Sequence, residues 1–399
     1  MRLTLNFIPR LVLATAFTTI FVAASASNTG FDVKLFKIDL AGEIPHLKSL
    51  VKNTRLPATA LYPNAGPSKG IDLETLRNLR TDWLTKYDWE AQQAELNQFN
   101  HFTTVIEGIT VHFVHEKSAE PDAIPVILLH GWPGSFHEFV PVIKPLTESA
   151  LTSTGNKVAF NVVVPSLPGF VFSSAPPTMN WTNDDTARIF NTLMTEALGY
   201  STYAVHGTDW GSGVGYSMYA SFQQNQEIAE NNITLSDVQK VTEQRFTFYE
   251  SIGNGYFTEQ TTKPNDIGLA LNDNPVGQLA WIGSKFKLCV NTPIRPEQHR
   301  NPHFCVTLLP HAVVFLSSVW IYAQNPTGFQ TVYTKAATDA PLLFSQFEYN
   351  PALWPEEYVA RLGNLVSYKV HDFGGHFAGL DNPPALIEDI RDIGIYFKA

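Results

Sequence analysis

The sequence predicts a doubly wound α/β core, because short apolar runs alternate with segments of helical periodicity. Continuous apolar runs suit parallel strands that are covered on both faces. They lie at Ile124–Leu129, Phe160–Val164 and Tyr203–Val205, and the alternation of strands and helices returns at Leu342–Phe344 and Leu365–Val370. Apolar residues repeat at helical spacing over 183–198, and a last helix is expected over about 384–397. We therefore expect a mostly parallel sheet with helices on both faces.

Two segments lie outside this alternation. Before the core, one helical stretch is expected from Asp72 to about Leu96, followed by a hairpin whose β-rich strands flank Glu107-Gly108-Ile109. Within the core, residues 222–334 are rich in Asn, Gln, Tyr and Trp and interrupt the strands, which indicates an inserted, mainly helical cap domain. In an open α/β sheet a pocket forms at the carboxyl ends of the strands, under such a cap. The expected parts are a signal peptide at 1–26, an N-terminal region at 27–120, the core at 121–221 and 335–399, and the cap at 222–334.

The composition describes a globular protein with a large core. Of its 399 residues 44% are hydrophobic and only 16% are charged, which excludes a disordered chain. The net charge is −10 and the basic residues form no long block, so nucleic acid is not expected as a partner.

Residues 1–26 have the pattern of a secretory signal peptide. Arg2 and Arg10 precede an almost uncharged run, and Ala24-Ser25-Ala26 supplies small residues where signal peptidase cuts. The apolar run is shorter than the ~20 residues that span a bilayer. We therefore expect secretion or residence in the secretory lumen, with an uncleaved membrane anchor as the alternative.

Other residues agree with a secretory compartment without requiring it. The sequons at Asn180 and Asn232 are candidates for glycosylation. Cys289 and Cys305 are the only cysteines, and they either pair in an oxidising compartment or remain two buried thiols.

The segment Gly207-Thr208-Asp209-Trp210-Gly211 has the form of a nucleophile elbow. Its glycines let a strand and a helix approach each other while a nucleophile projects from the sharp turn between them. Here the nucleophile is Asp209 rather than the usual Ser. A carboxylate that attacks an sp³ carbon forms an alkyl ester, so the chemistry points to epoxides or alkyl halides. A glycine-rich helix entry with a capping Asp is the structural alternative.

The loop His130-Gly131-Trp132-Pro133-Gly134 follows the first core strand, where half of an oxyanion hole is expected. Hydrolysis of an ester needs two donors aimed at one oxygen, and the backbone N–H groups of Trp132 and Trp210 are the natural pair. Pro133 is a candidate for a cis peptide bond that holds this loop in shape.

His376, in Gly374-Gly375-His376, directly follows the last predicted strand and completes the chain order of a nucleophile, an acid and a base. Glu348, after the preceding strand, is the first choice for the acid, and Asp372 is the second. His299 and His303 lie near Cys305, but no tetrahedral ligand spacing supports a metal site.

With these motifs the chain resembles the microsomal-type epoxide hydrolases, which have the α/β-hydrolase fold and an N-terminal meander. The resemblance covers nearly everything after residue 26. The matching stretches are Tyr87-Asp88-Trp89-Glu90 and Leu96-Asn97-Gln98-Phe99 in the N-terminal region, then His130–Phe136, Pro165–Phe170, Gly255–Gln260, Lys263-Pro264, Ala270–Gly277 and Gly374–Ala378. Two departures are Thr208, where the family usually has Gly, and the absence of the usual Pro ahead of Glu348.

The resemblance assigns two cap tyrosines as proton donors to the epoxide oxygen, Tyr256 and Tyr333, with Tyr322 as a rival for the second role. It implies that Asp209 opens a lipophilic epoxide, that His376 activates water to release a vicinal diol, and that neither a metal nor an organic cofactor takes part. A bulky apolar epoxide, from lipid or secondary metabolism or encountered in detoxification, is the expected substrate. A homodimer is possible. The alternatives are a haloalkane dehalogenase, which shares Asp209-Trp210, and a catalytically silent binding protein on the same scaffold.

Overall fold

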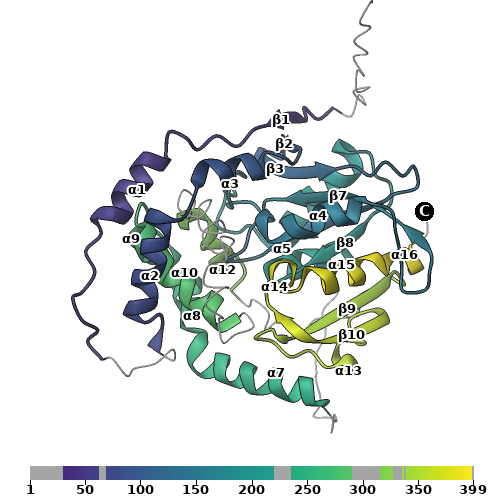
Figure 1. The fold of residues 1–399 in the computed structure, drawn as a ribbon. Coiled ribbons are helices and arrows are strands. Elements are labelled where there is room, and N and C mark those ends of the chain that lie inside the picture. Colours follow the sequence, from purple (N-terminus) through teal and green to yellow (C-terminus); the bar gives the residue numbers. More distant parts are fainter. Residues whose placement is uncertain are drawn as a thin grey trace, which may run out of the picture.

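A six-stranded sheet forms the centre of the molecule (Figure 1). The computed structural model describes residues 30–62, 69–219, 235–289, 315–326, 335–336 and 338–397. In spatial order the strands are β1 (Lys34–Phe36), β2 (His101–Ile106), β3 (Ile109–Glu116), β7 (Phe160–Pro165), β4 (Ile124–Leu129) and β8 (Ala204–Gly207). Strands β7, β4 and β8 pair in parallel, whereas β1, β2 and β3 pair antiparallel and extend the sheet at one edge.

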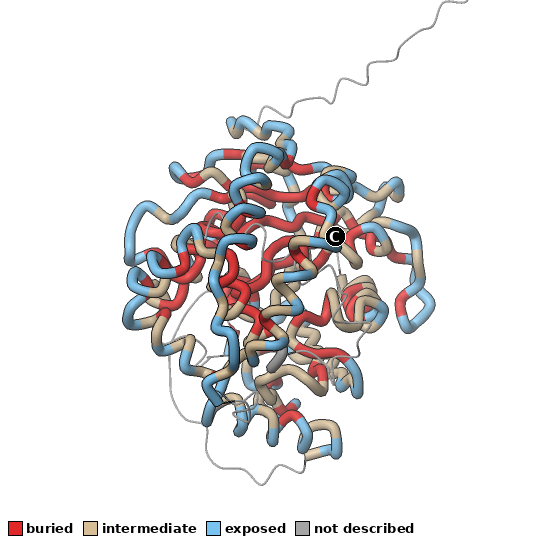
Figure 2. Tube along the Cα trace, turned by 60° about the vertical axis from the view of Figure 1, so that its left-hand side comes forward, coloured by how far each residue is buried: buried red, intermediate tan, exposed pale blue. Residues whose placement is uncertain are grey.

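The central strands are the most deeply buried part of the chain. From Val126 to Leu129 every side chain of β4 is inaccessible to solvent, as are Val162 to Val164 of β7. Figure 2 shows these strands as a continuous buried layer inside an exposed shell. This burial confirms the parallel strands expected from their apolar runs, because only a sheet covered on both faces can use strands without polar alternation.

Two further strands, β9 (Pro341–Tyr349) and β10 (Asn364–Gly375), form a parallel pair. Both are longer than the apolar runs predict, and their register shifts between His371 and Gly375. A short hairpin of β5 (Ala150–Leu151) and β6 (Lys157–Val158) lies apart from both sheets. The extra length of β9 changes which residue emerges first from its end.

Helices follow the core strands as the alternation predicts. They are η2 (Phe136–Phe139), α4 (Val140–Thr147), α5 (Asn183–Thr192), η3 (Leu193–Ala197), α6 (Trp210–Tyr219), α13 (Glu356–Val359), α14 (Ala378–Asp381), α15 (Pro383–Arg391) and α16 (Ile393–Tyr396). The helix expected over 183–198 starts at a capping box of Thr182 and Asp185 and continues as one π turn after Thr192. Where the sequence predicts one last helix the structure has two, α15 and α16, because the chain turns at Asp392 between them.

The N-terminal region contains α1 (Ile44–Asn53), α2 (Leu73–Thr85) and α3 (Trp89–Leu96). The single helix expected from Asp72 to Leu96 was wrong, since Asp88 caps a new helix by accepting a hydrogen bond from the Ala91 N–H. The predicted hairpin turn is confirmed. Its Glu107 and Gly108 have φ values of 50° and 80°, as a two-residue hairpin turn requires.

The inserted segment is helical wherever the structure describes it. Its helices are α7 (Asp237–Phe248), η4 (Tyr249–Gly253), α8 (Gly255–Thr262), α9 (Pro264–Leu271), α10 (Pro275–Cys289) and α12 (Trp320–Gln324). Helices α1 and α2 pack against α10, and Figure 1 shows them grouped with α8 and α9 on one side of the sheet. The N-terminal region thus touches the cap as well as the core.

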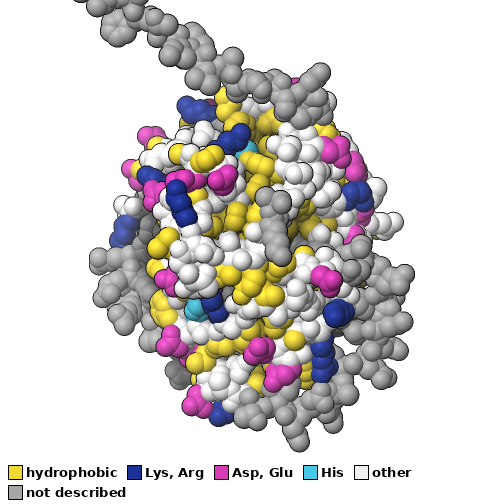
Figure 3. Space-filling view, turned by 90° about the vertical axis from the view of Figure 1, so that its right-hand side faces the viewer, with side chains coloured by type: hydrophobic (Ala, Val, Ile, Leu, Met, Phe, Trp, Pro, Cys, Tyr) yellow, Lys and Arg dark blue, Asp and Glu magenta, His cyan; other side chains and the backbone are white. Residues whose placement is uncertain are grey.

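Several sequence predictions fall outside the described residues: the signal peptide at 1–26, Asn232, Cys305 and Tyr333. Cys289 ends α10, and Asn180 is exposed in a turn before α5. In the part of the chain that the structure describes, no helix is long and apolar enough to cross a membrane. On the face shown in Figure 3, Lys and Arg side chains lie singly among Asp and Glu.

Candidate active site

The turn between β8 and α6 holds Asp209 in a strained conformation. Its φ is 48°, in the left-handed region that few residues other than glycine adopt. The two glycines beside it are sterically required, because a Cβ on Gly207 would collide with the Gly211 carbonyl and a Cβ on Gly211 would collide with the Leu129 carbonyl. Strand, turn and helix are therefore in direct backbone contact at this point, which is the arrangement of a nucleophile elbow.

The two carboxylate oxygens of Asp209 have different environments. Oδ1 accepts a hydrogen bond of 2.8 Å from the Trp132 backbone N–H. Oδ2 lies 3.3 Å from Nε2 of His376, and both side chains are largely buried. A Cβ on Gly131 would overlap Oδ1 and the Trp210 backbone nitrogen, so the loop passes directly over them. The Trp132–Pro133 peptide bond is cis, as expected. Oδ1 is thus bound by a backbone donor, whereas Oδ2 faces the imidazole.

The acid assigned from the sequence does not contact His376. Strand β9 continues to Tyr349, so Glu348 is still within the strand, and its backbone carbonyl accepts a hydrogen bond from the Thr242 hydroxyl. Among the described residues its carboxylate makes neither an ion pair nor a hydrogen bond with His376. The second choice, Asp372, is exposed within β10. The expected contact between Glu348 and His376 is therefore wrong, because the strand ends later than its apolar run.

Asn350 takes the place that the acid was expected to fill. Its Oδ1 lies 3.1 Å from Nδ1 of His376, while its Nδ2 donates a hydrogen bond of 3.2 Å to the Ala352 carbonyl. The amide is thereby oriented with its oxygen toward the imidazole, which keeps the proton on Nδ1 and leaves Nε2 free to act as a base. The sequence analysis does not predict Asn350, because an amide is not the usual partner of a catalytic histidine; the one signal for it is its place directly after the end of β9.

A buried carboxyl group lies beside the nucleophile. Glu138, in η2, is 3% exposed and accepts a hydrogen bond of 2.9 Å from the Thr208 hydroxyl. Burial raises the pKa of Glu138 well above its usual range, the Thr208 hydrogen bond opposes this, and the charge of Asp209 raises it further. This environment therefore disfavours the ionised form of Glu138. Thr208, which departs from the pattern of the resembling family, has this carboxyl as its partner.

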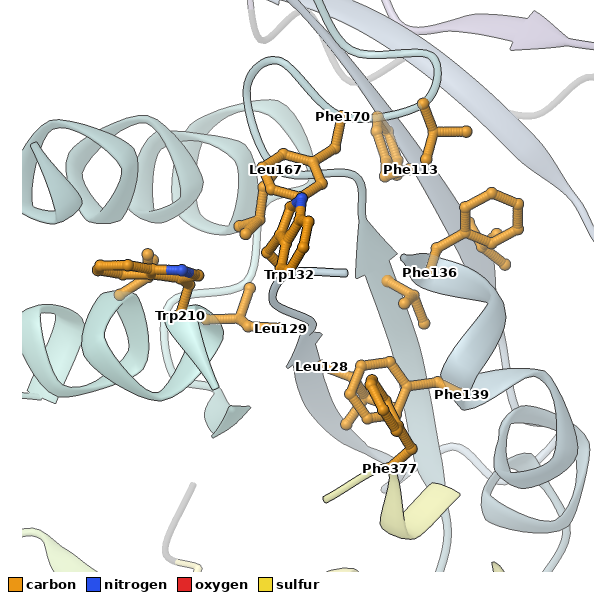
Figure 4. Packing of buried hydrophobic residues seen from close by; sticks show 14 of the residues in the cluster. Phe113, Leu128, Leu129, Trp132, Phe136, Phe139, Leu167, Phe170, Trp210 and Phe377 are labelled. Carbon is orange, nitrogen blue, oxygen red and sulfur yellow. The ribbon is translucent and has the colours of Figure 1, made fainter. Parts of the chain in front are cut away.

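Aromatic side chains from the core and the cap line the space above Asp209. The ring of Tyr256 stacks on Trp132 at 5.3 Å, and Tyr322 lies edge-on to Trp210 at 5.0 Å. Figure 4 shows the indoles of Trp132 and Trp210 among the buried side chains of the core. The Tyr256 hydroxyl is 2.7 Å from that of Tyr249, in the π turn η4. Of the two assigned tyrosines, the structure places Tyr256 at the site, and it also places Tyr322 there.

The environment keeps these phenols protonated. Burial raises the pKa of Tyr256 and Tyr322 well above the usual value, and the negative charge of Asp209 contributes to both shifts. Buried, protonated hydroxyls near a carboxylate nucleophile are suited to donate hydrogen bonds to a developing alkoxide.

Two other described histidines, His206 and His371, have structural surroundings. His206 packs edge-on to Phe139, and burial lowers its pKa to about 4. His371 contacts Asp389 at 2.7 Å. Within the described ranges no group of His, Cys, Asp and Glu side chains has the arrangement of a metal site.

Comparisons with known proteins agree with this geometry. Residues 33–139 match the family model described as the epoxide hydrolase N terminus, and residues 124–230 match the alpha/beta hydrolase fold. Juvenile hormone epoxide hydrolase 2 of Ctenocephalides felis is 32% identical over 371 residues, covering 81% of this chain and 78% of the relative. Epoxide hydrolase 1 of Oryctolagus cuniculus is 29% identical, covering 90% and 88%.

A solved structure gives the same result. The Aspergillus niger epoxide hydrolase superposes with a TM-score of 0.79 at 30% identity, covering 92% of this chain and 97% of that one. The α/β-hydrolase fold expected from the sequence is thus confirmed. With a matching N-terminal region, the same fold and relatives that align over most of their length, the chain belongs to the epoxide hydrolase family.

Proposed function

We propose that the protein converts a lipophilic epoxide to a vicinal diol through a covalent alkyl ester on Asp209. The observation that carries this proposal is that the two carboxylate oxygens of Asp209 have different environments. Oδ1 accepts a hydrogen bond from the Trp132 N–H, and Oδ2 faces His376. A carboxylate that acted only as a helix cap would not need a strained turn, a backbone donor and a facing imidazole.

In the first step, Oδ2 of Asp209 attacks one ring carbon and the C–O bond of the epoxide breaks. The cap tyrosine Tyr256 donates a hydrogen bond to the leaving oxygen, with Tyr333 as its proposed partner and Tyr322 as the nearest alternative among the described residues. The phenolic proton of the donating tyrosine passes to the alkoxide, which becomes a hydroxyl group, and the phenol is protonated again from solvent.

In the second step, Nε2 of His376 removes a proton from water, and the resulting hydroxide attacks the ester carbonyl carbon. The negative charge develops on the former Oδ1, which lies in the site formed by the Trp132 N–H and, we propose, the Trp210 N–H. Collapse of the intermediate breaks the bond between the carbonyl carbon and the alkyl oxygen, and the proton of the new carboxylic acid passes to that oxygen. The diol leaves, Asp209 is again a carboxylate, and His376 returns its proton to solvent.

A single turnover in ¹⁸O-labelled water tests this route. The first diol released should carry unlabelled oxygen from Asp209, and later turnovers should carry label. Asp209→Asn should abolish epoxide opening. Labelled oxygen throughout the first turnover would instead show direct attack by water, and halide release from an alkyl halide without epoxide opening would favour a dehalogenase.

The aromatic lining supports a bulky apolar epoxide as substrate. We further propose secretion after cleavage near Ser27, glycosylation at Asn180 and Asn232, and oxidation of Cys289 and Cys305 to a disulfide. N-terminal sequencing, glycosidase treatment and thiol titration of the secreted protein test these features, and light scattering tests a homodimer. An intact Met1 in a membrane fraction would contradict secretion.

A further inference from the structure

Once Asp209 has become an uncharged ester, the base of the proposed reaction has no charged partner in direct contact, although in the resting protein Oδ2 of Asp209 lies 3.3 Å from Nε2 of His376. In the second step His376 becomes a cation, but Nδ1 faces the neutral amide of Asn350. The amide fixes the tautomer and orientation of the ring, yet it cannot neutralise the positive charge. Asp209 cannot do so either at this stage, since its carboxylate is then an uncharged ester. A buried imidazolium without a counter-charge is costly, so another anion is required nearby.

Glu138 is unsuited to this role. It is buried and accepts a hydrogen bond from the Thr208 hydroxyl, and burial together with the charge of Asp209 raises its pKa, which disfavours the ionised form. Ionisation of Glu138 would place a second negative charge next to the nucleophile in the resting enzyme.

Asp381 has the required position. It ends the short helix α14, which begins two residues after His376 and packs against β10 and η2. The neighbouring Asn382 donates a hydrogen bond of 3.1 Å from Nδ2 to the Phe373 carbonyl, which fastens the end of the helix to the end of β10. The side chain of Asp381 is thus held beside the segment that carries His376.

The carboxyl group of Asp381 is also incompletely satisfied. Its Oδ2 atom is buried without a hydrogen-bond partner among the described residues. Burial raises the pKa of Asp381 to about 7, although the charge of His376 and a hydrogen bond from the Gly375 backbone oppose the shift. A buried carboxyl oxygen without a hydrogen-bond partner destabilises a fold and is therefore uncommon. Such groups concentrate at functional sites, and this one also interacts electrostatically with the proposed base.

Building on the proposed function, we propose that Asp381 supplies the negative charge missing at Asn350 and stabilises the His376 cation during ester hydrolysis. The two tasks of a triad acid are then divided between two residues. Asn350 orients the imidazole by hydrogen bonding, and Asp381 compensates its charge through space. Asp381 acts through His376, so it is a positioning residue that does not touch the substrate.

Separate measurement of alkylation and ester hydrolysis distinguishes this role of Asp381 from a structural one. With trans-stilbene oxide as the apolar probe, rapid mixing follows alkylation through the fluorescence of Trp210, which adjoins Asp209, and rapid quench follows release of the diol. At about pH 8, above the pKa of about 7, Asp381→Asn should leave alkylation within about twofold. It should slow ester hydrolysis roughly 10- to 100-fold, so that the alkyl enzyme accumulates.

Rescue gives the decisive comparison. Asn350→Asp places a carboxylate at Nδ1 of His376, so the double variant Asp381→Asn/Asn350→Asp should hydrolyse the ester at least about tenfold faster than Asp381→Asn alone. Glu388→Gln, which removes an exposed acid on α15, should change neither step. If Asp381→Asn does not fold, Asp381→Ser with and without Asn350→Asp gives the same comparison.

Unchanged hydrolysis in Asp381→Asn, or a double variant no faster than the single one, would overturn the assignment of Asp381. These outcomes differ from failure of the proposed function, in which the wild-type protein would neither form the alkyl enzyme nor release diol.

Discussion

The nucleophile half and the base half of the site are built by different means. The nucleophile half consists of the loop after β4 and the elbow after β8, two adjacent parallel strands. Its geometry depends on backbone contacts that exclude any side chain at Gly207 and Gly211. The base half consists of the ends of β9 and β10, whose register shifts before Gly375. The first half is encoded by local motifs, whereas the second depends on where two strands end.

The largest expected difference between the two chemical steps follows from loss of the proposed base, His376. In His376→Gln, alkylation of Asp209 should proceed because the nucleophile half is intact, while hydrolysis should fall by roughly 10³-fold or more. Intact-mass spectrometry should detect one covalently bound substrate per chain. A variant that turns over normally without the adduct would show that the two halves do not act in sequence.

The steric prediction for the nucleophile half is the next largest. Gly211→Ala should lower the free energy of unfolding by roughly 3 kcal/mol or more, since the added methyl group meets the Leu129 carbonyl, which cannot move without breaking the sheet. Gly255→Ala, where nothing lies within 4 Å of the added carbon, is the matched control. Chemical denaturation measures both. Equal stabilities of the two variants would contradict the close approach.

Tyr249 contacts Tyr256, the proposed proton donor in the cap, and removing its hydroxyl should have a smaller effect on the alkylation rate. Tyr249→Phe removes the hydroxyl 2.7 Å from that of Tyr256 and should slow alkylation by roughly tenfold, with little change in ester hydrolysis. Rapid-mixing kinetics separates the two steps. Slower ester hydrolysis with normal alkylation would instead show that Tyr249 supports the step in which His376 activates water.

The smallest expected effect is on stability and concerns Asp381. Its pKa in the folded protein is about 7, against an ordinary value of 3.8 for an aspartate, so the folded state binds the proton more tightly. Wild-type stability from this group is fully present below about pH 4 and is lost as the pH rises through 7. Asp381→Asn avoids this loss and should melt roughly 2–4 °C higher than wild type at pH 8, with no difference at pH 4. A lower melting temperature at pH 8 would indicate a stabilising structural role.

The two halves also differ in how far they follow from the sequence. The strands β4, β7 and β8 were predicted to within about a residue at most ends, and the elbow and the cis peptide bond before Pro133 were located from local motifs. These features arise from neighbours in the chain, namely apolar runs, glycine spacing and a proline. The parallel pairing of β9 and β10 was also expected, but their ends were not.

The sequence by itself determined the fold class and the family resemblance, and it located Asp209 and His376, the proposed nucleophile and base. Only the tertiary structure decided which side chain meets Nδ1 of His376, because β9 continues through Glu348 and Tyr349 and Asn350 is the first residue after the strand. It also decided that Asp381 lies buried beside the base and that Tyr249 meets Tyr256. The physical reason is that strand ends and buried electrostatic partners are set by packing between segments far apart in sequence, which no local pattern records.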